Sequence, residues 1–381
     1  MNLQEKLINY QQQSVTQLHD LLKSLVEIPA PSHHELERAK FIKSWLENVG
    51  AKGVYIDDAY NCVYPINLEN SNDIVVFMAH TDTVFPDLTP FQLKSDGEYF
   101  YAPGVCDDTS SLSIMLMATK FIIENDIKPN RGILIVANSG EEGLGNLKGC
   151  RKIMDTYGKR VKEFYTFDGN YNAVATRCVG SHRYEVEAQT EGGHSFMAFG
   201  NNNSIYELSR LICDLYDTEV PKKEGAKTTY NVGIIEGGTS VNTIAQSAKM
   251  LYEYRSDDFE CLAVMQKNFE EKVAKANARG KAKFTVKTVG LRPCGIEVDK
   301  AVHEKMIDMV KRSTIKHVGV EPRVKTSSTD CNIPLSMGIP AVCVGIYDGF
   351  GEHTREEKLL ISSMEKGLKI CFDIMLNYFE F

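Results

Sequence analysis

The chain has 381 residues, of which 43% are hydrophobic and 25% charged, and a net charge of −8 at pH 7, as in an ordinary soluble globular protein. Its charges are mixed without a long basic run, which argues against nucleic acid or an anionic membrane as the main partner. No stretch has the roughly 20 apolar residues of a membrane helix, and the N-terminal residues lack the apolar segment of a signal peptide. Ten singly scattered cysteines favour reduced thiols, so we expect a cytoplasmic protein.

The first and last parts of the chain alternate predicted strands with predicted helices. Hydrophobic spacing predicts helices at 15–28, 34–51, 110–125, 301–313 and 359–379, and strands at 54–66, 73–80, 131–140, 163–170, 173–178 and 341–347. Alternation of this kind indicates an α/β fold, with a mixed, largely parallel sheet flanked by helices.

A change of pattern near Cys178 predicts a second domain. The following segment reads strand, helix, strand, strand, helix, strand, which is the order of a split ferredoxin-like unit. These elements are expected at 182–190, 204–217, 228–237, 247–256, 261–278 and 281–289. A chain of this length usually has more than one core. We therefore expect one domain formed by 1–178 and 292–381, with an α+β domain of 179–291 inserted into it.

The apolar run DIVVFMAH ends in His80, and Asp82 follows two residues later. Residues i and i+2 of a strand point to the same side, so the two side chains are expected to be neighbours. A metal-bound histidine usually donates its second ring N–H to a carboxylate. We interpret His80 as a candidate metal ligand and Asp82 as its orienting partner, although H-x-D alone is a weak signal.

Paired acids follow two further elements. Asp107 and Asp108 lie in a turn just before a predicted helix, where carboxylates can equally serve as helix N-caps. Glu141 and Glu142 follow the buried strand 131–140, where a solvated surface pair is the alternative to a functional pair. The carboxyl ends of core strands are nevertheless where α/β enzymes build their sites.

Two more polar residues at strand exits complete the set. Asp168 follows an aromatic strand, and His353 lies in a glycine-rich loop after the strand 341–347, where a solvated histidine is the alternative. The metal-capable groups that share this position are His80, Asp107, Glu142, Asp168 and His353. Each of these residues alone would be weak evidence, but five of them together indicate a metal site.

The ordered set H-x-D, G-x-x-D-D, S-G-E-E-G, a later Asp and G-x-H-T resembles the aminoacylase/peptidase T/carboxypeptidase G family of co-catalytic zinc hydrolases. The match covers nearly the whole chain, and the order of motifs is specific. The resemblance implies one metal ion held by His80, Asp107 and Asp168, and a second held by Asp107, Glu142 and His353. It further implies that Glu141 is the general base and that the Asp107–Asp108 peptide bond is cis.

Nitrogen and oxygen ligands suit two Zn²⁺ ions, with Mn²⁺ or Co²⁺ also possible. The resemblance implies that the inserted domain is a lid and a dimerisation domain, so we expect a homodimer. It also implies that His194, Asn242 and Arg255 bind substrate, Arg255 through a carboxylate. The alternative for these three is an ordinary surface role. Ser327 and Ser328 replace the glycines of the family's G-G-T-D segment. Whether this segment contacts the substrate pocket therefore stays open.

The segments GGHSFMAFGN and SSTDCNIPLSMGIPAV are most similar to the peptidase T-like branch. We therefore expect a metal-dependent exopeptidase that hydrolyses di- and tripeptides. A deacylase of N-acyl amino acids with the same metal centre is the alternative. The loops that distinguish the two activities have structures that residue spacing does not predict. A catalytically silent metal- or peptide-binding scaffold would lack a base or a ligand, and none is missing from the motif set.

Overall fold

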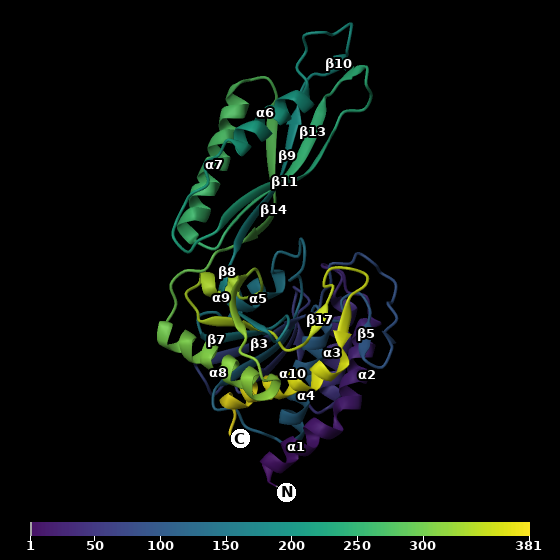
Figure 1. Ribbon diagram of the computed structural model, residues 1–381, viewed down its shortest axis with the longest axis vertical. Coiled ribbons are helices and arrows are strands. Elements are labelled where there is room, and N and C mark those ends of the chain that lie inside the picture. The colour runs from purple at the N-terminus through teal and green to yellow at the C-terminus, as the bar shows by residue number, and fades with distance from the viewer. Residues whose placement is uncertain (1) are drawn as a thin grey trace. The chain divides into compact units, whose positions relative to one another are not determined.

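The computed structural model describes residues 2–381 and divides into two units (Figure 1). Unit 1 comprises Met1–Cys178 and Ile296–Phe381, and unit 2 comprises Val179–Gly295. The helices of unit 1 are α1 Leu3–Gln13, α2 Val15–Val26, α3 Leu36–Asn48, α4 Thr109–Glu124, α5 Lys148–Tyr157, α8 Lys300–Val318, α9 Asn332–Ser336 and α10 Ile361–Met375, followed by the 3-10 turn Leu376–Tyr378.

Unit 1 is built on a sheet of eight strands. These are β1 Tyr55–Ile56, β2 Cys62–Ile66, β3 Ile74–His80, β6 Gly132–Asn138, β7 Val161–Phe167, β8 Ala173–Cys178, β15 Arg323–Ser327 and β16 Ala341–Val344. Their order is β1-β2-β6-β3-β7-β16-β8-β15. The pairs β6–β3, β3–β7, β7–β16 and β8–β15 are parallel and the others antiparallel. The expected mixed, largely parallel sheet flanked by helices is confirmed.

Helices cover both faces of this sheet, which explains why β3 is apolar throughout. Val75 and Phe77 belong to the core under α2, α4 and α10, whereas Val76 and Met78 belong to the core under α5 and α9. All seven residues of β3 are buried. Because a strand covered on both faces has no solvent side, a continuous hydrophobic run replaces the polar–apolar alternation of an exposed sheet.

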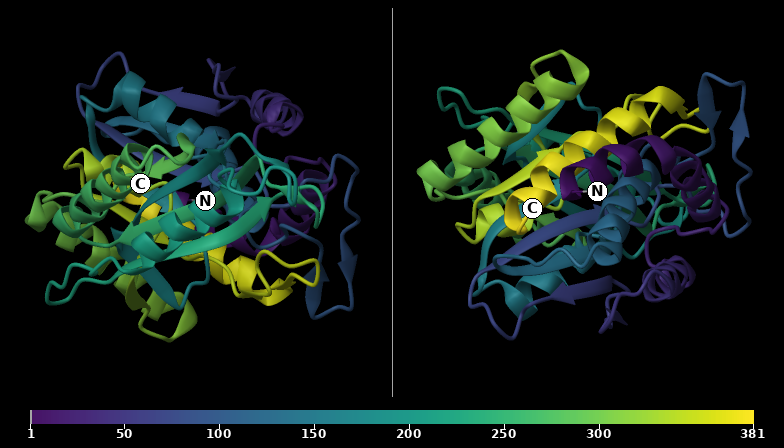
Figure 2. Two further views of the ribbon diagram at one scale, coloured as in Figure 1. Left: turned by 90° about the horizontal axis from the view of Figure 1, so that it is seen from above. Right: turned by 90° about the horizontal axis from the view of Figure 1, so that it is seen from below.

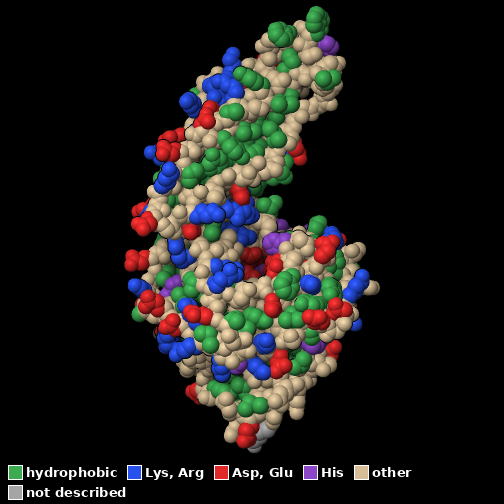
Figure 3. Space-filling model, viewed as in Figure 1, with side chains coloured by type: hydrophobic (Ala, Val, Ile, Leu, Met, Phe, Trp, Pro, Cys, Tyr) green, Lys and Arg blue, Asp and Glu red, His purple; other side chains and the backbone are tan. Residues whose placement is uncertain are grey.

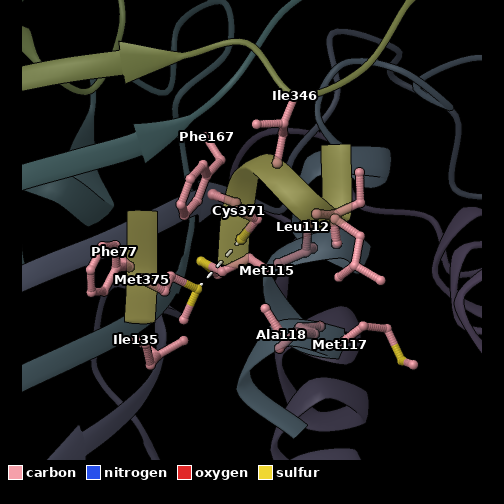
Figure 4. Close-up of a cluster of buried hydrophobic side chains, with 14 of the residues drawn as sticks. Phe77, Leu112, Met115, Met117, Ala118, Ile135, Phe167, Ile346, Cys371 and Met375 are labelled. Carbon is pink, nitrogen blue, oxygen red and sulfur yellow. Dashed lines mark hydrogen bonds between the residues drawn. The ribbon is translucent and has the colours of Figure 1, made fainter. Parts of the chain in front are cut away.

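The larger of the two cores joins the sheet to α4 and α10. Phe77 and Ile135 come from the sheet, and they pack with Met115 of α4 and Met375 of α10 (Figure 4). Gly367 lets α10 approach the chain closely, since a Cβ at this position would lie 1.8 Å from the carbonyl oxygen of Ile346. Helix α10 lies between α8 and α1 (Figure 2).

A small second sheet of unit 1 lies beside the segment that contains His353. Its strands are β17 Gly349–Phe350, β18 Lys358–Leu360, β5 Tyr99–Tyr101 and β4 Lys94–Ser95, in that order. All three pairings are antiparallel. The sheet therefore ties the segment that carries His353 to the segment that precedes Asp107.

Apart from the two-residue strands β10 and β12, which pair only with each other, unit 2 has the element order β-α-β-β-α-β. Its elements are β9 Gly180–Gln189, β10 Gly193–His194, α6 Ser204–Tyr216, β11 Thr228–Gly237, β12 Thr243–Ile244, β13 Ser247–Ser256, α7 Phe259–Ala278 and β14 Lys283–Arg292. The antiparallel sheet β11-β13-β9-β14 packs against α6 and α7. Along β9, Tyr184, Val186 and Ala188 are buried and alternate with less buried polar residues, as in a sheet covered on one face.

Charged side chains of both signs are interspersed on the face of unit 1 drawn in Figure 3. None of the helices within residues 2–381 combines the length and the apolar content that crossing a bilayer requires.

Candidate metal centre

Three candidate ligands from separate elements meet in unit 1. His80 ends β3, Asp107 lies in the turn before α4, and Glu142 follows β6. One ligand atom of each lies within 4.8 Å of the others. The strands β3 and β6 are parallel neighbours, and His80 pairs with Asn138 at their carboxyl ends. The local fold thus brings two motifs that are about 60 residues apart to one edge of the sheet.

Asp107 faces two histidines with its two carboxylate oxygens. Its Oδ1 lies 2.9 Å from Nε2 of His80, and its Oδ2 lies 3.0 Å from Nε2 of His353. The same His353 nitrogen lies 3.2 Å from Oε1 of Glu142. A carboxylate placed between two imidazoles in this way has the geometry of a bridging ligand.

Electrostatic interactions across the cluster are strong. Burial, and then the charge of Asp107, raise the pKa of Glu142 to about 7 and that of Asp168 to about 6. Hydrogen bonds from His353 and His80 outweigh burial and hold the pKa of Asp107 below its usual range. The same contacts with Asp107 and Glu142 raise the pKa of His353 to about 11.

Asp168 lies at the end of a third strand of the eight-stranded sheet. It follows β7, and its backbone N–H donates to the carbonyl of Val344 at 3.0 Å. It is not part of the group whose ligand atoms all meet within 4.8 Å. The charge of Asp107 nevertheless raises the Asp168 pKa, which places the two carboxylates in one electrostatic site.

Asp82 contacts more than its histidine neighbour. Nδ1 of His80 lies 3.0 Å from the Asp82 backbone carbonyl and 3.5 Å from its carboxylate. That carboxylate accepts the backbone N–H groups of Glu141 at 3.0 Å and Glu142 at 2.9 Å, together with the Ser32 hydroxyl at 2.7 Å. Asp82 therefore holds the turn that contains both glutamates, a role that the H-x-D spacing did not predict.

Asp108 is not the side-chain cap of α4, although it occupies the N-cap position. Its carboxylate accepts the backbone N–H of His80 at 3.1 Å instead. The Asp107–Asp108 peptide bond is cis, so that expectation is confirmed. Both aspartates thus face the end of β3, which decides against the capping interpretation of this pair.

Arg38 is a buried residue of the site that the sequence did not single out. Its Nη1 donates to the Thr81 carbonyl at 2.7 Å, and Nε and Nη2 donate to the Ile28 carbonyl. Burial lowers the pKa of Arg38 to about 10, while the charge of Asp82 counteracts this effect. The sequence around Arg38 contains only a helical pattern with mixed charges, and that pattern does not distinguish a buried arginine from a solvated one.

The three predicted substrate-binding residues lie in unit 2. His194 and Asn242 lie close together, because the N–H of Ser195 donates to the Asn242 carbonyl at 3.0 Å. Arg255 lies on β13 of the four-stranded sheet, where its Nε and Nη2 each donate to Glu253 at 3.0 Å. Glu253 also accepts from Nε of Arg183 at 3.3 Å.

The residues in the cluster fit divalent metal ions. They combine two imidazole nitrogens with carboxylate oxygens, the donor set of zinc, manganese or cobalt sites. Several carboxylates held together in a buried place raise one another's pKa, and divalent cations would neutralise this repulsion. Divalent ions held by such a cluster could polarise a carbonyl group and activate a water molecule, which is the chemistry of metal-dependent hydrolases.

Comparison with known families agrees with this assignment. The sequence model of peptidase family M20/M25/M40 matches residues 76–377, and the chain belongs to this family. A peptidase M20 domain-containing protein of Schizosaccharomyces pombe is 29% identical over 61% of this chain and 58% of its own length. A succinyl-diaminopimelate desuccinylase of Corynebacterium glutamicum is 25% identical over 89% of this chain and 90% of its own length. The structure of a Staphylococcus aureus tripeptidase superposes with a TM-score of 0.75 at 21% identity, covering 95% of this chain and 97% of that one.

Proposed function

We propose that the protein is an exopeptidase of di- and tripeptides, in the peptidase T-like branch of its family, that works with two divalent metal ions. The observation that carries the proposal is the position of Asp107, whose two oxygens lie 2.9 and 3.0 Å from two different histidine nitrogens. A carboxylate in this position could serve two neighbouring ions at once.

The five candidate ligands divide between two positions. His80, Asp107 and Asp168 would hold one ion, and Asp107, Glu142 and His353 would hold the other, with zinc the best match to these donors. Bound ions would polarise the scissile carbonyl and lower the pKa of a water molecule towards neutrality.

Glu141 is proposed as the general base. The backbone N–H of Glu141 donates to the Asp82 carboxylate, and Glu141 itself is 6% exposed. From this position a carboxylate can accept a proton from the attacking water and return it to the leaving amine. Because the adjacent Glu142 faces His353, the two neighbouring glutamates would have different roles.

Residues of unit 2 are proposed to bind the rest of the substrate. Arg255 would pair with the free carboxylate of a peptide, since its planar guanidinium suits a carboxylate and Glu253 fixes its orientation. His194 would support the developing oxyanion, and Asn242 would contact substrate polar groups. We assign unit 2 the roles of lid and homodimer contact, and the ten free cysteines support a cytoplasmic location.

Deacylation of N-acyl amino acids is the second candidate function. The similarity to a desuccinylase over 89% of the chain favours it, and the same metal centre would serve both reactions. A silent scaffold is the weakest candidate, because the motif set of the sequence lacks neither a candidate ligand nor a candidate base.

A substrate panel tests the proposal. The purified protein, loaded with zinc or manganese, is incubated with dipeptides, tripeptides, and N-acetyl and N-succinyl amino acids, and the products are read by mass spectrometry. We expect hydrolysis of peptides with a free carboxylate to be at least tenfold faster than deacylation. Faster deacylation would establish the second candidate, and no hydrolysis of any compound would refute both.

A further inference from the structure

We propose that Glu357 is a positioning residue of the metal centre, whose carboxylate fixes the turn of Asp107 to the segment that carries His353. This inference rests on the proposed metal site and adds a residue to it. Glu357 is not itself a candidate ligand, so its effect on the ions would pass through Asp107 and His353.

The contacts of Glu357 join two distant parts of the chain. Its Oε2 accepts the backbone N–H of Gly104 at 2.7 Å. Its Oε1 accepts the N–H groups of Cys106 at 2.8 Å and Asp107 at 3.0 Å. One carboxylate therefore binds three backbone donors of the turn, including that of Asp107, 250 residues away.

The turn at 104–107 is shaped to receive an anion. Gly104 has φ +74, and a Cβ there would lie 2.5 Å from Cγ2 of Thr83, so the chain can take this path only with glycine. Successive N–H groups that converge from a turn form a concave anion-binding nest. Glu357 is 1% exposed and fills this nest from within the protein.

The same region fixes the segment that contains His353 at several other points. The Cys106 thiol donates to the Lys358 carbonyl at 3.2 Å, next to the pairing of β18 with β5. Arg355 donates to both carboxylate oxygens of Asp87, at 3.2 and 2.7 Å. His353 precedes these anchors and has φ +66, a conformation that is uncommon for a non-glycine residue.

The consequence is that Glu357 controls the separation of Asp107 and His353, which lie 3.0 Å apart at their ligand atoms. Three backbone N–H groups donate hydrogen bonds to Glu357 and hold the turn that contains Asp107, and His353 lies four residues before Glu357 in the chain. Residues that orient metal ligands typically change metal affinity or activity by about 10–100-fold when mutated.

The test compares Glu357→Gln and Glu357→Asp with the wild-type protein. In either orientation, the glutamine NH₂ group would face at least one of the three N–H donors, because an amide nitrogen cannot accept a hydrogen bond. The aspartate keeps both oxygens but shortens the reach by one methylene group. Glu356→Gln is the matched control, since Glu356 is the exposed neighbour in the same segment and the substitution is the same.

Zinc affinity is measured by competition with a chromophoric chelator, and folding by circular dichroism and thermal melting in excess zinc. We expect Glu357→Gln to bind zinc about 10–100-fold more weakly while melting cooperatively, and Glu357→Asp to be weakened in the same direction. Glu356→Gln should bind like the wild type. The Co²⁺-substituted variants should also show an altered visible spectrum, which a purely structural defect elsewhere would not produce.

Wild-type zinc affinity in both Glu357 variants would overturn the proposal. Loss of cooperative melting in both variants in saturating zinc would also overturn it, because Glu357 would then be a general requirement for folding. Neither readout depends on turnover. If the wild type binds two ions but hydrolyses no compound of the panel, the proposed function fails while the role of Glu357 can still be measured.

Discussion

Asp107 and His353 are 246 residues apart in the sequence, and Oδ2 of the first lies 3.0 Å from Nε2 of the second. The other oxygen of Asp107 contacts His80, so one carboxylate connects the end of β3 with the loop after β17. The proposed mechanism with two cooperating ions would depend on this connection.

Glu141→Ala should abolish hydrolysis without removing metal. Glu141 would only exchange protons with water and the leaving group, so its loss is expected to lower kcat by at least about 100-fold. Metal content is measured by mass spectrometry and turnover on the best peptide of the panel. Glu69→Gln, an exposed acid outside the site, is the control. Retained activity would mean that another group is the base.

Asp82→Asn should impair catalysis more than folding. The asparagine NH₂ group would face the N–H of either Glu141 or Glu142, so the turn that carries both residues would shift. We expect kcat to fall by about 10–100-fold in steady-state kinetics. Ser32→Ala removes only one hydroxyl donor to Asp82 and should have a smaller effect. Equal, small effects of both changes would argue against this role for Asp82.

The metal-free protein should become less stable as the pH rises from about 5 to 7. In the folded chain the pKa is about 6 for Asp168 and about 7 for Glu142, both above the ordinary values of 3.8 and 4.5. An acid with a raised folded pKa favours folding while it is protonated, and this contribution is lost as the pH rises through the folded value.

Thermal melts with a chelator and with saturating zinc, over this pH range, measure the effect. Zinc takes the place of the protons, and a ligand at 1,000 times its Kd adds about 4 kcal/mol to stability. The gap between the two melting temperatures should therefore widen towards pH 7. A gap that stays constant or narrows would contradict the assignment of these acids to a metal site.

Gly367→Ala should destabilise unit 1, although alanine is the better helix former. The new Cβ would lie 1.8 Å from the Ile346 carbonyl oxygen, so α10 would have to move away from the chain it packs against. We expect a loss of about 1–3 kcal/mol in chemical denaturation, as for other overpacked cores. Ser362→Ala, on the exposed side of the same helix, should change stability by less than about 0.5 kcal/mol.

The candidate ligands that follow strands could be predicted from the sequence, because apolar strands rarely end in acids or histidines. Parallel strands then bring their carboxyl ends to the same side of the sheet. The sequence-based helices omitted α1, α5 and the short α9. For α1 a signal was present, since Asn2 and Glu5 form a capping box. Helix α5 follows Leu147 in a left-handed conformation without a side-chain cap, so nothing local marked its start.

Residues that support the site could not be predicted in the same way. Arg38 and Glu357 resemble ordinary charged residues of a helix and a loop, and only the folded chain shows that both are buried against backbone groups. The carboxylate of Asp82 likewise has partners 59 and 60 residues away. Long-range hydrogen bonds leave no local pattern, whereas strand and helix periodicity does.

The metal-to-protein ratio in the wild type, His353→Ala and Asp107→Ala, measured by mass spectrometry after removal of loosely bound zinc, tests the shared role of Asp107 most directly. The expected ratios are about two, one and zero, because only Asp107 would serve both ions. An Asp107→Ala protein that folds and retains two ions would contradict a bridged pair at this cluster.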